Sequence, residues 1–124
     1  MASEQEQLNI TLKAEGDLSS YQYYAVNVTN SGYGTIAAGS AAYTVGILQN
    51  KPAAYGRAAK VCVAGHTKAI AGAAISTIGY VEVLNHGLVQ GVSTQSHNVI
   101  GINTTTAAGS GEYVEILLGR WRHG

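Results

Sequence analysis

The stretch Ala59-Lys60-Val61-Cys62-Val63-Ala64 is an apolar run closed by Gly65-His66. Val61 and Val63 lie two residues apart, so on an extended strand they point to the same face. A glycine next to a polar residue is typical of a turn, and the pattern therefore predicts a short strand that ends near Gly65-His66. Cys62 is the only cysteine, which excludes an intramolecular disulfide, and its apolar neighbours indicate a buried, inert thiol.

The same alternation of period two recurs on both sides of this stretch. The apolar positions of the other expected strands are Leu8, Ile10, Leu12; Tyr24, Val26, Val28; Tyr43, Val45, Ile47; Val81, Val83; Leu88, Val89; Val99, Ile100, Ile102; and Val114, Ile116, Leu118. Turn residues separate these strands at Asn30-Ser31-Gly32, at Asn50-Lys51-Pro52 and at Asn85-His86-Gly87, which reads as a tight hairpin loop. Short strands about every 8 to 12 residues predict a small, Gly-rich all-β barrel or sandwich without a convincing helix.

The beginning of the chain carries one strand pattern, and no second strand follows it after a short turn. An isolated strand is not stable, so this one must join a sheet of its own barrel or of a neighbouring subunit. We therefore expect an extended N-terminal arm over residues 1–17, a β-barrel domain over 18–118 and a C-terminal tail over 119–124.

The composition restricts the class of function. Only 11% of the 124 residues are charged, against about 25% in ordinary soluble domains, and such a surface favours association. The net charge of 0 argues against a nucleic-acid or electrostatic membrane partner. The chain has eight tyrosines and no phenylalanine. Tyrosine is typical of interfaces that stay partly hydrated rather than of a deep core, because its hydroxyl needs a hydrogen-bond partner. Neither a signal peptide nor an apolar stretch of about 20 residues is recognisable, so we expect synthesis in a cytoplasm.

Residues that could carry catalysis are sparse. The spacing of the four histidines matches no zinc-binding motif. The only aspartate, Asp17, falls in the expected arm, which argues against a Ser-His-Asp catalytic triad. Gly32-Tyr33-Gly34 and Gly109-Ser110-Gly111 read as loops, because no helix follows them to complete a dinucleotide-binding motif. We expect no enzyme, no catalytic residues, no cofactor and no metal; a small hydrolase is the enzymatic rival.

One further stretch of the sequence is distinctive: Gly46-Ile47-Leu48-Gln49-Asn50-Lys51-Pro52-Ala53-Ala54. This stretch resembles a segment of the small capsid cement (head-decoration) proteins of tailed bacteriophages. Further similar segments follow the family's order: 17–26, 61–68, 71–75, 99–102 and 114–118. The chain departs from the pattern at Gly56, one position later than usual, in the strand-like segment between Gly79 and Gly91, and in its Arg-Trp-Arg tail. The resemblance implies a β-tulip-like or small barrel fold, homotrimers on the capsid, and an arm that reaches the major capsid protein.

These observations lead to one hypothesis with named residues. We expect a virion protein on the outer capsid surface that cements the expanded shell by bridging major capsid subunits, with Leu8, Ile10 and Leu12 as the capsid-contact arm. The residues expected at oligomer or capsid interfaces are Tyr21, Tyr23, Tyr33, Trp121 and Arg122, although the last two could equally be part of a solvated terminus. Alternatives are a carbohydrate-binding or host-adhesion β module and a tail or baseplate subunit.

Overall fold

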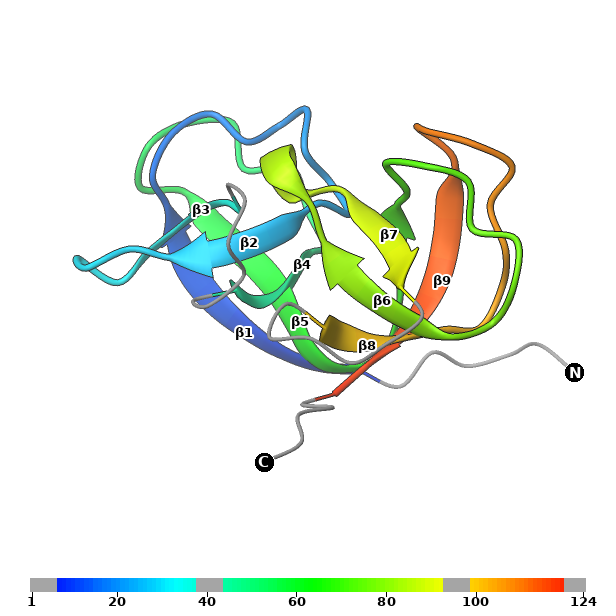
Figure 1. The fold of residues 1–124 in the computed structure, drawn as a ribbon. Coiled ribbons are helices and arrows are strands. Elements are labelled where there is room, and N and C mark those ends of the chain that lie inside the picture. Colours follow the sequence, from blue (N-terminus) through cyan, green and yellow to red (C-terminus); the bar gives the residue numbers. More distant parts are fainter. Residues whose placement is uncertain (1–6, 38–43, 93–98, 120–124) are drawn as a thin grey trace, which may run out of the picture.

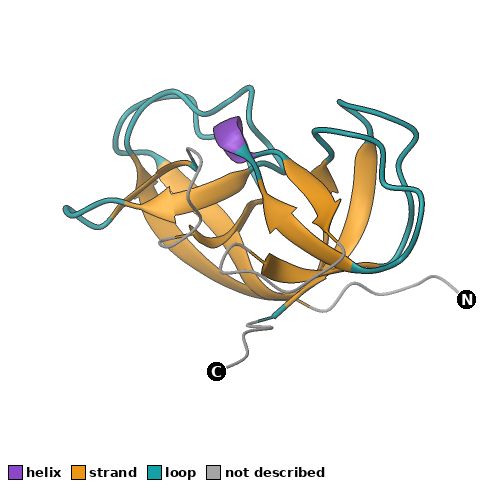
Figure 2. Ribbon diagram, in the orientation of Figure 1, coloured by secondary structure: helices purple, strands orange, loops and turns teal. Residues whose placement is uncertain are grey.

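The computed structural model describes residues 7–37, 44–92 and 99–119, and this part of the chain is all-β (Figures 1 and 2), which confirms the predicted fold class. The strands are β1 (Gln7–Ala14), β2 (Ala25–Val28), β3 (Tyr33–Ile36), β4 (Thr44–Leu48), β5 (Ala58–Ile70), β6 (Tyr80–Val83), β7 (Val89–Val92), β8 (Val99–Asn103) and β9 (Tyr113–Leu118). A 3-10 turn, η1 (Asn85–Gly87), joins β6 to β7.

Five strands close into a barrel in the order β1-β3-β2-β4-β5, because β5 also pairs with β1. The β1–β3 pair is parallel, and the other four pairs are antiparallel. This arrangement corrects the expected boundary of the arm. Gln7–Ala14 is an integral strand of this chain's own barrel, since its backbone pairs with β5 from Gln7 to Lys13. Residues 1–6 lie outside the described part.

The strand β5 is 13 residues long and belongs to two parts of the fold. Its first half pairs with β1 and β4, whereas Gly65–Ile70 pairs with β9, which continues through β8 and β6 to β7 (Figure 1). The predicted end at Gly65-His66 was therefore wrong. Gly65 has a φ of 105°, a value that favours glycine, and the strand continues beyond it because β9 supplies new backbone partners.

Two hydrophobic cores lie on opposite sides of the wall formed by β4 and β5. The cross-strand pair Leu48 and Val61 belongs to the core inside the barrel, together with Val26. The next pair, Ile47 and Cys62, belongs to the core shared with β6 to β9. Successive strand residues point to opposite faces, so one alternating sequence fills both cores.

Two predictions about short segments had different outcomes. The tight turn at Asn85-His86-Gly87 is confirmed, with His86 and Gly87 both at positive φ (66° and 76°). Gly32-Tyr33-Gly34 was expected to be a loop, but Tyr33 begins β3. The strand forms because β2 provides a partner, with Val26 opposite Ile36, and strands of this length are specified mainly by such pairing.

Two glycines allow the backbones of neighbouring strands to approach closely. A Cβ atom on Gly46 of β4 would lie 1.9 Å from the carbonyl oxygen of Cys62 in β5. A Cβ atom on Gly101 of β8 would lie 2.1 Å from the carbonyl oxygen of Leu117 in β9. Both contacts involve main-chain atoms, so a side chain at either position requires the strands to separate.

Gly46→Ala and Gly101→Ala should each lower the free energy of unfolding by about 1–3 kcal/mol or more, because the added methyl group overpacks a backbone contact. Urea unfolding followed by circular dichroism measures this change. Gly91→Ala is the matched control, since a Cβ atom there would meet its nearest neighbour, Ile75, at an ordinary 3.6 Å. Equal stability of all three variants would contradict this account of the strand spacing.

Candidate functional site

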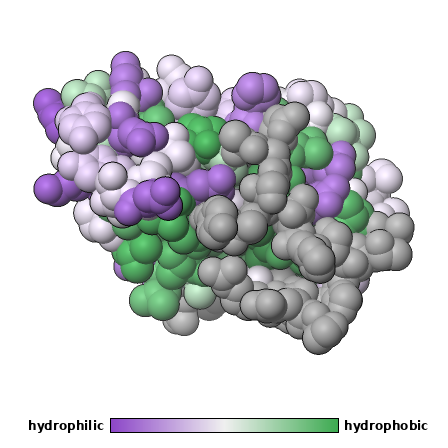
Figure 3. Space-filling model, turned by 60° about the vertical axis from the view of Figure 1, so that its left-hand side comes forward, coloured by the Kyte–Doolittle hydropathy of each residue, from purple (hydrophilic) through white to green (hydrophobic). Residues whose placement is uncertain are grey.

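An apolar row on β1 emerges from the barrel core and reaches the surface. Ile10 lies opposite Val61 of β5, and Leu12 packs against the barrel core. Exposure increases towards the start of the strand, to 38% for Ile10 and 62% for Leu8. We name Leu8 and Ile10 the apolar end of β1. The face of the molecule in Figure 3 also shows hydrophobic surface gathered below a more polar region. Contact of these residues with a capsid stays a prediction.

A second feature is a group of aromatic side chains, the tyrosine cluster, formed by Tyr21, Tyr23, Tyr24 and Tyr113. Tyr21 and Tyr24 meet edge to face with ring centroids 5.1 Å apart, and Tyr23 and Tyr113 do so at 5.7 Å. The Lys68 ammonium lies 5.5 Å from the Tyr113 ring centroid and 6.0 Å from that of Tyr23. Such cation–π contacts help to hold both rings in place.

The loop that carries three of these tyrosines is fixed by its backbone. The amide of Tyr21 donates to the carbonyl of Leu18 at 3.0 Å, and that of Tyr24 donates to Tyr21 at 3.0 Å. The amide of Tyr23 donates to Leu48 of β4 at 2.7 Å, and its carbonyl accepts from Ile70 of β5 at 3.2 Å. Tyr23 has a φ of 72°, a left-handed conformation that is uncommon for a bulky residue and persists only where the surroundings impose it.

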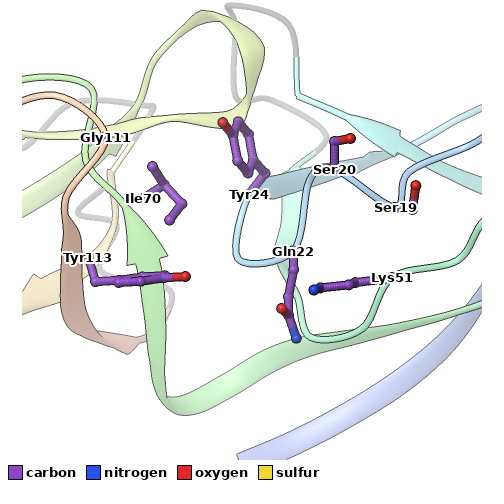
Figure 4. Close-up of a pocket in the computed structure, with 8 residues that line it drawn as sticks. All are labelled: Ser19, Ser20, Gln22, Tyr24, Lys51, Ile70, Gly111 and Tyr113. Atoms are coloured by element: carbon purple, nitrogen blue, oxygen red, sulfur yellow. The ribbon is translucent and has the colours of Figure 1, made fainter.

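A surface hollow of about 370 Å³ opens beside this cluster (Figure 4). Its walls are the loop residues Ser19, Ser20, Gln22 and Tyr24 on one side, with Lys51 next to them, and Ile70, Gly111 and Tyr113 on the other. In Figure 4 the Tyr113 hydroxyl and the Lys51 ammonium point towards each other from opposite sides. The hollow thus combines aromatic surface with several polar groups that can donate and accept hydrogen bonds.

The structure brings together only part of the interface set that the sequence predicted. Tyr21 and Tyr23 lie in the tyrosine cluster, whereas Tyr33 stacks on Tyr55 with ring centroids 5.2 Å apart. The neighbouring Tyr33 hydroxyl raises the pKa of Tyr55. Trp121 and Arg122 lie outside the described residues. Whether any of these side chains meets a partner stays a prediction.

Sequence reasoning missed Tyr24, Tyr113, Lys51 and Lys68 as members of this region. The run Tyr21-Gln22-Tyr23-Tyr24 was a signal, because three tyrosines so close together cannot all enter one core. No local signal marked Tyr113 or the two lysines. They reach the region through the β4–β5 turn and through the β5–β9 pairing, which places Ile70 opposite Tyr113.

The described ionisable groups form few close arrangements. His66 was expected in a turn but lies within β5; its Nε2 is 2.9 Å from the Thr104 hydroxyl and 3.4 Å from the Glu115 carboxylate. Within residues 7–37, 44–92 and 99–119, no three His, Cys, Asp or Glu side chains gather as metal ligands would. The same residues contain no helix long and apolar enough to span a bilayer.

Comparison with solved structures shows a similarity in fold. No family model matches the sequence, and no curated protein matches it. Among solved structures, the N base of the head fiber protein gp8.5 of bacteriophage phi29 superposes with a TM-score of 0.62. The match covers 95% of this chain and 100% of that chain at 16% sequence identity. At this identity the similarity establishes a shared fold.

The single cysteine should be unreactive in the folded protein. Cys62 is fully buried, its Sγ lies 3.2 Å from the Ala64 carbonyl oxygen, and burial raises the pKa of its thiol. A raised pKa reduces the fraction of nucleophilic thiolate at any given pH. Ellman's reagent at pH 8 should therefore react with Cys62 only after denaturation. Equal reaction rates for the native and the unfolded chain would contradict its burial.

Proposed function

We propose that this chain is a structural protein of a bacteriophage virion that sits on the outside of the head and strengthens the shell. The observation that carries the proposal is the shared fold with the base of a phage head fiber, which extends over the whole of that chain. The segments that resemble capsid cement proteins, above all residues 46–54, point to the same class of protein.

The surface of the molecule supports a role in assembly. Charged residues are few, and the apolar end of β1 leaves a leucine and an isoleucine in contact with water. Apolar side chains gathered at one end of a barrel are suited to burial against another protein. In the proposed complex, Leu8 and Ile10 pack against the major capsid protein, and the subunits associate as a homotrimer.

The proposed mechanism is passive reinforcement and needs no catalytic step. A protein that binds only the expanded shell stabilises that state by mass action, since each bound copy lowers its free energy relative to the unexpanded one. A trimer that contacts several capsid subunits at once gains avidity from its linked sites. Bridging therefore opposes the separation of neighbouring capsid subunits under the pressure of packaged DNA.

Leu8→Glu should abolish or strongly weaken head binding while the protein stays folded, because Leu8 is 62% exposed and contributes little to the barrel core. Burial of a leucine side chain contributes about 1.5–3 kcal/mol, so its loss should weaken binding roughly tenfold or more. The measurement is co-sedimentation with expanded heads assembled from the genome that encodes this chain, with the gene for this chain disrupted.

Ile78→Glu is the matched control, because Ile78 is 60% exposed but lies outside the barrel strands. It should bind heads like the unaltered chain. A deletion of residues 2–15 is unsuitable as a test, since it removes β1 and opens the barrel. If the unaltered chain does not co-sediment with heads, the proposed function is wrong; if Leu8→Glu binds normally, the apolar end of β1 is not the contact.

A further inference from the structure

We propose that the hollow beside the tyrosine cluster is a saccharide-binding site that takes one pyranose unit and prefers a sugar that carries a carboxylate. This function goes beyond attachment to a head, and the site lies on residues other than the apolar end of β1. The proposal rests on the shape of the hollow, on its lining groups and on the rigidity of its walls.

The size and lining of the hollow match a small polar ligand with an apolar face. Its volume of about 370 Å³ falls within the range of small-molecule sites, roughly 300–1,000 Å³. A pyranose ring presents C–H groups on its faces and hydroxyl groups around its edge. Tyr113, which is 58% exposed, offers a ring for the C–H face, while Ser20 and Gln22 offer polar groups for the hydroxyls.

The charge at the hollow favours an acidic sugar over a neutral one. The Lys51 ammonium lines the hollow and forms no ion pair with any described residue. The carboxylate of Asp17, two residues before Ser19 in the chain, accepts hydrogen bonds from the Ser19 amide at 2.9 Å and the Ser19 hydroxyl at 2.6 Å. Lys51 is thus available for a charge-assisted hydrogen bond, which is about twice as strong as a neutral one.

The walls of the hollow are anchored before any ligand arrives. The Gln22 side-chain amide donates to the Gln49 carbonyl at 2.9 Å, and the Leu18 amide donates to the Pro52 carbonyl at 2.8 Å. On the opposite side, the Gly111 amide donates to Ala71 at 2.8 Å. A preorganised site binds more tightly because little conformational entropy is lost on binding.

The strained backbone of Tyr23 points to the same region independently. Its ring packs against Tyr113 and contacts Lys68, so its unusual φ places an aromatic support behind the exposed wall of the hollow. Left-handed conformations of residues other than glycine cost free energy and concentrate at ligand-binding and other functional sites.

The experiment has two parts: a microarray of immobilised saccharides, and titration with methyl β-D-glucuronide and methyl β-D-glucoside followed by ¹H–¹⁵N NMR. We expect binding to acidic saccharides on the array, and amide shifts confined to residues 18–24, 49–51 and 109–113. Tyr113→Ala should weaken binding of both sugars about tenfold, the effect of losing one well-placed aromatic contact. Lys51→Gln should weaken only glucuronide binding, and it keeps the test decisive if Tyr113→Ala does not fold.

Tyr55→Ala is the matched control, because Tyr55 is 66% exposed but stacks on Tyr33 outside the hollow. It should leave saccharide binding unchanged. The proposal is overturned if no saccharide binds, or if Lys51→Gln and Tyr113→Ala bind like the unaltered chain. It is also overturned if Tyr113→Ala changes the oligomeric mass by native mass spectrometry, since the hollow would then be a contact between copies of this chain.

Discussion

The pairing of β5 with three other strands, β1, β4 and β9, is the constraint on which the rest of the structure depends. Its first half closes the barrel against β1 and β4, and its second half starts the β9-β8-β6-β7 extension. Gly65 lets the strand change direction between the two parts without ending, and Gly46 lets β4 approach its backbone. Because Val61 and Cys62 face different cores, neither core can form correctly unless this one strand is in register.

Both candidate surfaces follow from that arrangement. The β1–β5 pairing carries an apolar row out of the barrel core to Leu8, which is the proposed contact with a head. The β5–β9 pairing sets Tyr113 opposite Ile70, at the edge of the hollow. A single chain with few charges could therefore dock through one region and offer a polar, aromatic site at another. Since the barrel and its extension share a strand, the two regions are held by one continuous hydrogen-bonded sheet.

The sequence allowed the fold class to be predicted, but the pairing of strands only in part. Alternation at Leu8 to Leu12 and at Val114 to Leu118 reports local conformation, and both segments are strands. The alternation of apolar and polar residues does not indicate which strands pair with one another. The partner of β1 therefore stayed open, and the continuation of β5 past Gly65 was missed. The tyrosine cluster was predicted only in part for the same reason, because Tyr113 lies about 90 residues from Tyr23 and meets it only through long-range pairing.

A cryo-electron microscopy reconstruction of heads, with and without the purified chain, tests the proposed function most directly. We expect additional density on the outer surface of the expanded head, grouped in threes. The start of β1 should face the shell, and the hollow beside Tyr113 should open to solvent. Heads without added density would contradict the proposed attachment, and density with Leu8 turned away from the shell would contradict the contact assigned to the apolar end of β1.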